Sequence, residues 1–174
     1  MSTELVGAAA IEGPYRYTLD RVWRPCSGLS WDRLVWVMLN PSTADAVCDD
    51  PTIRRCILIA QAHGYAGMRV LNLFAWRATN PRDLVLRGTA KGDVVGPDND
   101  RYLREAATSH YAIALAWGAA GARTEVRVRV SCVMDILRRA NGKLLCLGLT
   151  KGGQPRHPLF VRSSTKLVLW EDPV

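Results

Sequence analysis

The sequence predicts a three-layer α/β protein with a central, mostly parallel, four-stranded sheet. Short apolar runs alternate along the chain with segments of helical periodicity, which is the pattern of βαβ units. The chain has 174 residues, the size of one domain, so we expect a single domain over residues 1–174. Its apolar fraction of 48% with 22% charged residues is typical of a folded domain and excludes a disordered or collagen-like chain.

Two buried strands and an intervening helix are predicted in the first half of the chain. Residues 34–39 form a compact apolar run rich in Val and Trp, and residues 68–73 form a second run of this kind. Between them, Asp50 followed by a proline is a typical helix start, and apolar residues then recur at helical spacing until Gly64. We expect residues 15–19 to add an antiparallel strand at the edge of the sheet.

The second half of the chain repeats this alternation after a long loop. Residues 78–97 are rich in Gly and Pro and predict a surface loop. A helix is expected over 98–109, a buried strand over 111–117, a further helix over 126–137 and a fourth strand over 144–149. No internal repeat or linker interrupts this order, which predicts parallel strands with helices on both faces of the sheet.

The sequence indicates neither a membrane protein, nor a secreted protein, nor a metal-binding protein. The longest apolar runs, such as residues 35–39, are far shorter than the roughly 20 residues that cross a bilayer, and residues 1–4 do not begin a signal peptide. We therefore expect a cytoplasmic protein that does not bind membranes. The five cysteines (positions 26, 48, 56, 132 and 146) include no closely spaced pair, so we expect reduced thiols, no metal and no other cofactor.

The charge of the chain favours an acidic partner. The net charge is +7 and the isoelectric point is near 9.5. Residues 123–174 hold ten Lys or Arg and four Asp or Glu, so six of the seven net positive charges lie in the last third of the chain. Such a region is typical of proteins that bind a phosphate backbone, although a solvated basic face without a partner has the same composition. We expect a nucleic acid as the partner and no obligate protein partner.

A distinctive polar element follows each of the four predicted strands. These elements are Asn40-Pro41-Ser42, Asn72, Trp117-Gly118 and His157-Pro158. Because ligands of open α/β sheets bind beyond the carboxyl ends of the strands, we expect these elements to meet in one site. An asparagine can read the amide edge of a pyrimidine, and a histidine can donate to an oxygen that gains negative charge as a ring departs. Taken singly, Asn-Pro is also a common turn, and a lone histidine is also common on surfaces.

Three segments carry a resemblance to a known family. Residues 35–42 (VWVMLNPS), 50–55 (DPTIRR) and 69–77 (RVLNLFAWR) resemble the bacterial and phage family called domain of unknown function 1643. More distantly, the order of the strand-end motifs is similar to that of the uracil-DNA glycosylase superfamily. This similarity implies a uracil-DNA-glycosylase-like fold and a DNA glycosylase that flips its target base out of the stack.

The resemblance to the uracil-DNA glycosylase superfamily also implies roles for single residues. Asn40 would orient the attacking water, Asn72 would hydrogen-bond the Watson–Crick edge of the flipped base, and His157 would stabilise the negative charge on the departing base. We expect Phe74 or Trp76 to offer a stacking face for that base. No lysine lies in the matching motifs, so the resemblance implies a monofunctional enzyme without a lyase step.

The chain departs from the superfamily at the first of these positions. Many members have an aspartate where this chain has Asn40, and an amide cannot accept a proton as a general base. Asp45, Asp49 or Asp50 could supply the missing carboxylate, and Asp50 is also expected to cap the helix that it precedes. Other branches of the superfamily also have an asparagine at this position, so the resemblance still implies catalysis.

Ser42 marks a second departure from the superfamily. In the uracil-specific branch a tyrosine at this position fills the space beside C5 of the base, whereas Ser42 and the small residues after it leave room for a substituent. We expect a pocket for a C5-substituted pyrimidine, such as a hypermodified cytosine of phage DNA, which implies a role in defence against phage. The alternative is that Ser42 is only a turn residue.

DNA contacts are expected beside the late His-Pro loop and near the ends of the first two strands. Leu159 or Phe160 would enter the base stack, although the Ser-Pro pair that usually follows His-Pro in the superfamily is absent. Several basic side chains near these elements are expected either to contact phosphates or to be only solvated: Arg54, Arg77, Arg156 and Arg162.

Two other functions fit the same residues. One is a catalytically silent nucleic-acid-binding module, which the missing aspartate favours. The other is a hydrolase of free modified nucleotides, which would need no polymer contacts.

Overall fold

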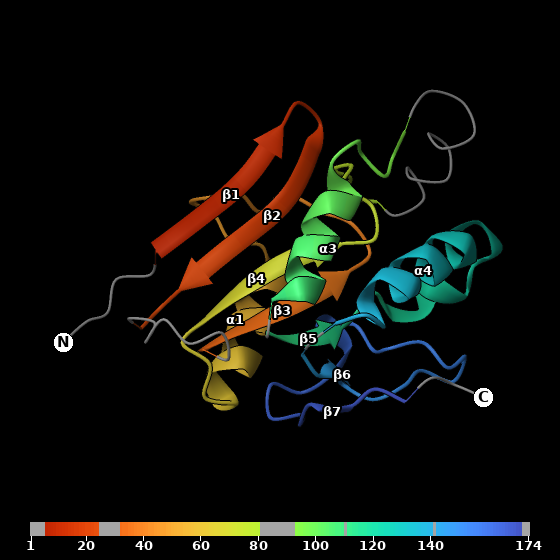
Figure 1. Ribbon diagram of the computed structural model, residues 1–174. Helices are drawn as coiled ribbons and strands as arrows, with labels where there is room; N and C mark the ends of the chain where they lie inside the picture. Colours follow the sequence, from red (N-terminus) through yellow and green to blue (C-terminus); the bar gives the residue numbers. More distant parts are fainter. Residues whose placement is uncertain (1–5, 25–31, 81–92, 110, 141, 172–174) are drawn as a thin grey trace.

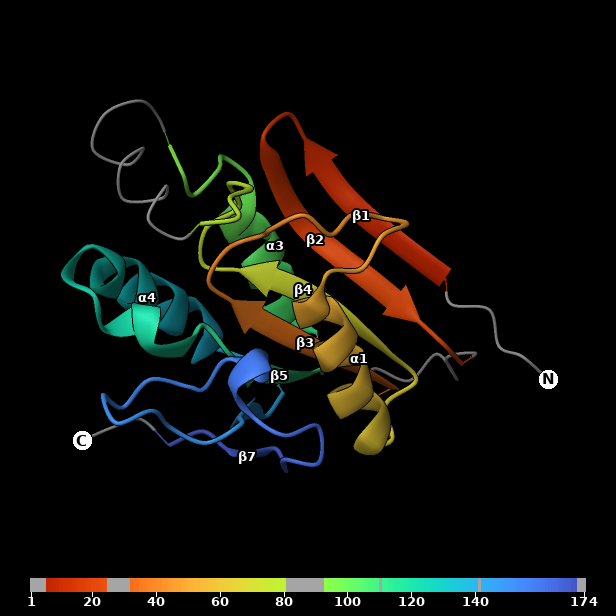
Figure 2. The same ribbon diagram turned by 180° about the vertical axis from the view of Figure 1, so that it is seen from behind.

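The computed structural model describes residues 6–24, 32–80, 93–109, 111–140 and 142–171 (Figures 1 and 2). Its strands are β1 (Val6–Glu12), β2 (Tyr15–Val22), β3 (Arg33–Met38), β4 (Gly67–Asn72), β5 (Ala112–Leu115), β6 (Leu144–Cys146) and β7 (Val168–Leu169). Its α-helices are α1 (Pro51–Ala62), α3 (Asn99–Thr108) and α4 (Thr124–Leu137), and the 3₁₀ helices are η2 (Gly118–Ala122) and η3 (Pro158–Phe160).

The described strands form one mixed sheet of seven, in the order β1-β2-β4-β3-β5-β6-β7. The neighbours β4, β3, β5 and β6 pair in parallel, whereas β1, β2 and β7 pair antiparallel. The α/β class is confirmed, but the predicted number of four strands is wrong. β1 is largely exposed and β7 has two residues, so neither carries a buried apolar run. β2 is not an edge strand as expected, because β1 pairs with its outer side.

Helices cover both faces of the sheet (Figures 1 and 2). α1 packs over Leu34 and Trp36, and α3 and α4 pack over Val35 and Val37 on the opposite face. All four of these β3 residues are fully buried. Burial on both faces is the reason that β3 is an unbroken apolar run rather than an alternating one.

The predicted helices and parallel strands lie within a few residues of their observed bounds. α1 begins after Asp50, whose Oδ1 accepts a hydrogen bond from the N–H of Ile53 at 2.8 Å. It ends at its C-cap His63, before Gly64 with φ of +84°. The predicted loop over 78–97 is described only at its ends, since residues 81–92 lie outside the described residues. Among the described helices, none combines the length and apolar character needed to cross a bilayer.

A β-bulge in β2 decides which of its side chains face α1. The pairing with β1 leaves Tyr17 as an extra residue, and Tyr17 stacks on Tyr102 of α3 with ring centroids 5.2 Å apart. Arg16 and Arg21 lie on the other face, although they are five positions apart and regular alternation would place them on opposite faces. Both donate to backbone carbonyls of the segment between β3 and α1.

Arg21 anchors that segment to the sheet. Its side chain is 1% exposed, its Nε donates to Oδ1 of Asp49 at 2.9 Å, and its Nη2 donates to the carbonyl of Asp45 at 2.6 Å. A second Arg–Asp pair joins Arg69 of β4 to Asp20 of β2, but there the arginine side chain is 34% exposed. The two pairs share one chemistry and have carboxylates of similar burial, and they differ in the burial of the arginine.

We expect the substitution R21M to lower the free energy of unfolding by about 3 kcal/mol, because it removes a fully buried guanidinium that donates to the Asp49 carboxylate and to the backbone carbonyls of Asp20 and Asp45. The control R69M leaves a carboxylate of similar burial without its cation, but Arg69 is 34% exposed and water can replace it, so the expected cost is less than about 1 kcal/mol. Urea denaturation followed by circular dichroism measures both. Equal losses would contradict an anchoring role that depends on burial.

Candidate functional site

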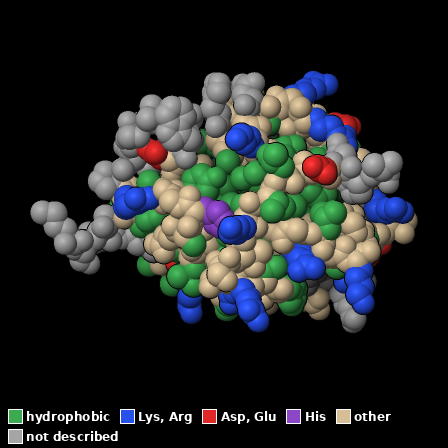
Figure 3. All heavy atoms as spheres, turned by 90° about the horizontal axis from the view of Figure 1, so that it is seen from below, with side chains coloured by type: hydrophobic (Ala, Val, Ile, Leu, Met, Phe, Trp, Pro, Cys, Tyr) green, Lys and Arg blue, Asp and Glu red, His purple; other side chains and the backbone are tan. Residues whose placement is uncertain are grey.

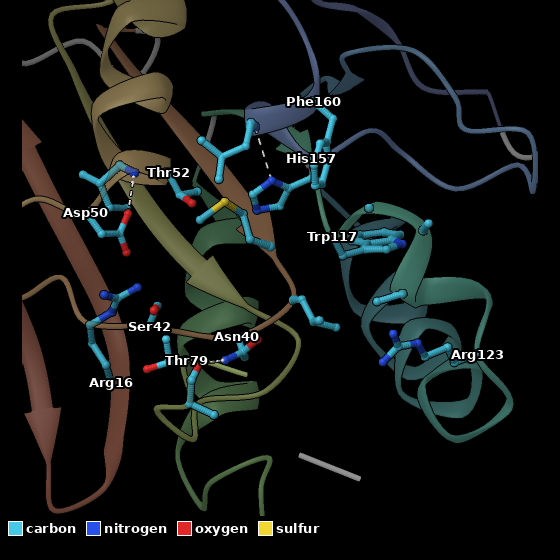
Figure 4. Close-up of a pocket in the computed structure, with 18 residues that line it drawn as sticks. Arg16, Asn40, Ser42, Asp50, Thr52, Thr79, Trp117, Arg123, His157 and Phe160 are labelled. Atoms are coloured by element: carbon cyan, nitrogen blue, oxygen red, sulfur yellow. Dashed lines mark hydrogen bonds between the residues drawn. The ribbon is translucent and has the colours of Figure 1, made fainter. Parts of the chain in front are cut away.

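A pocket of about 590 Å³ lies at the carboxyl ends of β3 and β5, beside the N-terminus of α1 and the two 3₁₀ helices (Figure 4). Its volume is within the range of roughly 300–1,000 Å³ that is usual for small-molecule sites. The elements after β3, β5 and β6 therefore meet in one place. Ten of the lining residues are labelled in Figure 4: Arg16, Asn40, Ser42, Asp50, Thr52, Thr79, Trp117, Arg123, His157 and Phe160.

Asn40 follows the end of β3 and lines the pocket. Its Nδ2 donates to the carbonyl of Ala78 at 2.7 Å and to the carbonyl of Pro41 at 2.9 Å. Because both hydrogens of this amide nitrogen are used within the protein, Oδ1 is the atom that the side chain offers to a ligand. Oδ1 can orient a water molecule or accept from an N–H, but it cannot remove a proton.

Of the three candidate carboxylates, Asp50 is the one that lines the pocket. One of its oxygens caps α1 through the N–H of Ile53, which leaves the other oxygen for a ligand or a water. The carboxylate of Asp45 instead accepts from the N–H groups of Val47 and Cys48, which lowers its pKa. Asp49 is paired with Arg21. Asp50 thus combines the cap position expected from the sequence with a place in the pocket.

His157 presents a hydrogen-bond donor to the pocket. It caps η3, with its Nδ1 accepting from the N–H of Leu159 at 3.3 Å. Burial lowers the pKa of His157, and the nearby Asp50 opposes this shift only in part. The imidazole is therefore neutral near pH 7, and because Nδ1 is an acceptor, its proton lies on Nε2. Nε2–H is suited to an oxygen that gains negative charge.

The Trp117-Gly118 corner holds the His157 segment in place. Gly118 has φ of +73°, and a Cβ there would lie 3.1 Å from Cβ of His157. The N–H of Gly118 donates to the carbonyl of Pro155 at 2.9 Å, and Nε1 of Trp117 donates to Oε1 of Gln154 at 2.8 Å. The positive φ therefore favours a glycine at this strand end, and the close approach of His157 leaves little room for a Cβ.

Arg55 of α1 holds the other end of this segment. Its Nη1 donates to the carbonyl of Val161 at 2.6 Å, across 106 positions of sequence. Its neighbour Arg54 donates to the carbonyl of Asp49 at 2.9 Å. Arg55 therefore positions the loop that carries His157.

Two residues expected to stack on a base lie outside the pocket. Phe74 is 6% exposed and belongs to the core under α3 and α4. Trp76 packs edge-on against Tyr15, with ring centroids 5.6 Å apart. The aromatic side chains that line the pocket are Trp117 and Phe160.

Asn72 lies beside the pocket and does not line it. It pairs in register with Met38, which is a lining residue, and strand alternation puts both side chains on the α1 face. Asn72 is 1% exposed, and both its Nδ2 and its Oδ1 are buried without a hydrogen-bond partner. A fully buried amide without partners is rare, and it requires an explanation such as a ligand or a water.

Of the expected DNA-contacting residues, Leu159 and Phe160 line the pocket. Leu159 and Phe160 of η3 are 41% and 83% exposed. Arg156 and Arg162 flank this helix and are exposed, while Arg77 lines a smaller hollow next to Ser42 and Thr43. Basic side chains are spread over the face seen in Figure 3, where acidic ones are few.

Sequence reasoning missed Arg16 as a pocket residue. The order Tyr15-Arg16-Tyr17 indicates that the arginine faces away from the two tyrosines. It does not show that the opposite face holds a pocket, because that depends on the bulge at Tyr17 and on the segment after β3.

We expect G118A to displace His157, since the added methyl group meets the histidine Cβ. The control G148A introduces the same strain, because Gly148 has φ of +83°, but nothing lies within 4 Å of its Cβ. Both variants are expected to lose about 1 kcal/mol of stability. Only G118A should also shift the imidazole NMR signals of His157. Unchanged signals in G118A would contradict the packing described above.

We also expect the stability that depends on His157 to fall as the pH drops from about 7 to 5. Burial lowers its pKa, so the folded chain binds this proton less readily than the unfolded chain. That stability is complete above the ordinary pKa of about 6.5 and is lost as the pH falls through the lowered value. Thermal melts should show a steeper decline of Tm for the wild type than for H157Q, whereas parallel curves would contradict the lowered pKa of His157.

Comparison with known proteins identifies the family of this chain. No curated protein and no solved structure matches it. A family model described as a protein of unknown function (DUF1643) matches residues 16–159, which include every strand-end motif up to His157-Pro158. The chain therefore belongs to the DUF1643 family.

Proposed function

We propose that this protein is a monofunctional DNA glycosylase that hydrolyses the N-glycosidic bond of a C5-substituted pyrimidine and leaves an abasic site. One observation carries the proposal: a single pocket holds the Asp50 carboxylate, the Asn40 amide oxygen and the Nε2–H of a neutral His157. A carboxylate and an amide oxygen suit a water nucleophile, and an imidazole N–H suits a departing base.

The topology of the sheet supports the proposed likeness to the uracil-DNA glycosylase superfamily. The parallel strands lie in the order β4-β3-β5-β6, so β3, the first of them in the chain, is paired on both sides. Its Asn-Pro end then lies between the ends of β4 and β5, with the His-Pro loop beyond β6. This arrangement is a switch point of strand order, where α/β proteins bind their ligands.

The proposed reaction breaks the bond between C1′ of the sugar and the base nitrogen. The bonding electrons leave with the base, and the Nε2–H of His157 stabilises the negative charge that develops on a carbonyl oxygen of the base. Asn40 Oδ1 and the free oxygen of Asp50 orient the water that attacks C1′. Asp50 accepts the proton of that water, and the departed base takes up a proton from solvent.

Base recognition is assigned to Asn72 and Ser42. The unpartnered amide of Asn72 has a donor NH₂ group and an acceptor oxygen to offer to a pyrimidine edge, and its register partner Met38, which has a flexible side chain, lines the pocket. Ser42 is small and lines the pocket, which supports room for a substituent at C5. A hypermodified cytosine of phage DNA is a substrate of this class, and its removal would serve defence against phage.

The exposed side chains of η3 are the proposed wedge that replaces the flipped nucleotide. Leu159 and Phe160 lie two and three residues after His157, so a side chain in the base stack would bring the imidazole to the extruded base. Arg156 and Arg162 on either side are the proposed phosphate contacts.

We expect release of a modified base, measured as alkali-sensitive cleavage of end-labelled oligonucleotides that contain uracil, mismatched thymine, 5-hydroxymethylcytosine or its glucosylated form. H157Q removes the donor to the leaving group and should lower the rate by about 10²–10³-fold. D50N removes the proton acceptor and should lower it by about 10²–10⁴-fold. N40A should lower it as well, because the water loses an acceptor.

The variant D45N is the matched control, since Asp45 lies outside the pocket and its backbone hydrogen bonds suit an asparagine. Its rate should stay within about threefold of the wild type. Salt-sensitive binding of DNA without an abasic product from any oligonucleotide would contradict the enzyme and favour a silent binding module. Excision of plain uracil alone would contradict the C5 specificity.

A further inference from the structure

One buried cation in the pocket has no part in the proposed reaction. Arg16 is 1% exposed and lines the cavity. In Figure 4 its guanidinium points toward the same space as Asp50 and Ser42. The bulge at Tyr17 is what turns this side chain away from α3.

The hydrogen bonds of Arg16 leave much of its guanidinium unused. Nη1 donates to the carbonyl of Ala44 at 2.7 Å, whereas Nε is buried without a partner. Among the described residues, no carboxylate lies within ion-pair distance of this group. Burying a cation without a counter-ion is unfavourable, so a site of this kind is completed by an anion.

The charged groups around Arg16 do not replace that anion. Asp50 and Asp45 attract the guanidinium from a distance, but neither carboxylate forms one of the described ion pairs or hydrogen bonds with it. Arg21 and Arg77 repel it. Burial lowers the pKa of Arg16 to about 10, which still leaves the guanidinium charged at neutral pH.

We propose that Arg16 binds an oxyanion that the substrate carries into the pocket. A guanidinium matches the geometry of a carboxylate or a phosphate. The oxyanion is therefore either a carboxylate on C5 of the target base or the phosphate of a free nucleotide. The pyrimidine part of this assignment rests on the proposed function, whereas the anion subsite rests on Arg16 and is tested by binding alone.

The test measures binding of two matched pairs of probes at one ionic strength. One pair is a duplex oligonucleotide with a single 5-carboxylcytosine and the same duplex with the neutral 5-hydroxymethylcytosine. The other pair is dCMP and deoxycytidine. We expect the wild type to bind the charged member of one pair about 10- to 100-fold more tightly. R16Q should abolish this preference and R16K should keep part of it. The control R101Q, on the exposed face of α3, should leave it unchanged.

The outcomes separate the sources of the anion and the two proposals. A preference in the oligonucleotide pair assigns the oxyanion to the base, and a preference in the other pair assigns it to a nucleotide phosphate. No preference in the wild type overturns the subsite, and this comparison needs no variant that must fold. The subsite is also overturned if folded R16Q loses the same factor of affinity for the charged and for the neutral probes. If neutral bases are excised but the charged probes are not bound more tightly than the neutral ones, only the anion subsite is refuted. If charged probes bind in an Arg16-dependent way but no base is excised, only the glycosylase is refuted.

Discussion

Parallel pairing of strands that are buried on both faces is the constraint on which the site depends. β4, β3, β5 and β6 run in one direction, so their carboxyl ends meet at one edge of the sheet. Helices above and below fill both faces and leave that edge as the place where loops converge. The pocket therefore follows from the topology, and the loop residues decide what it can bind.

The polar side chains of the pocket share one design. Each of three side chains uses one polar atom to bind a backbone group: Asn40 uses Nδ2, Asp50 uses one carboxylate oxygen and His157 uses Nδ1. The other polar atom of each side chain is kept for a ligand. Such bonds fix the side chains before a ligand arrives, which is the arrangement that electrostatic stabilisation of a transition state requires. Arg16 and Asn72 differ from this design, since each keeps a buried polar atom without a partner.

Much of the fold was predictable because its signals are local. The apolar runs of β3 and β4, the cap at Asp50 and the glycine after α1 are read from a few neighbouring residues, and the structure has them where they were expected. β1 and β7 were not predictable, because exposed or very short strands depend on their partners rather than on a pattern of their own. Phe74 and Trp76 were misplaced for a related reason: adjacency to a strand end does not reveal which side chains the core buries.

The sequence by itself determined the fold class, the helices and parallel strands, and the polar residues that follow those strands, because periodicity and capping are properties of consecutive residues. Only the tertiary structure decided that Asp50, and neither Asp45 nor Asp49, faces the pocket, and that Nδ1 of His157 is an acceptor. It also decided that a bulge turns Arg16 inward. These features depend on strand register and on contacts between segments distant in the chain, which no local pattern encodes.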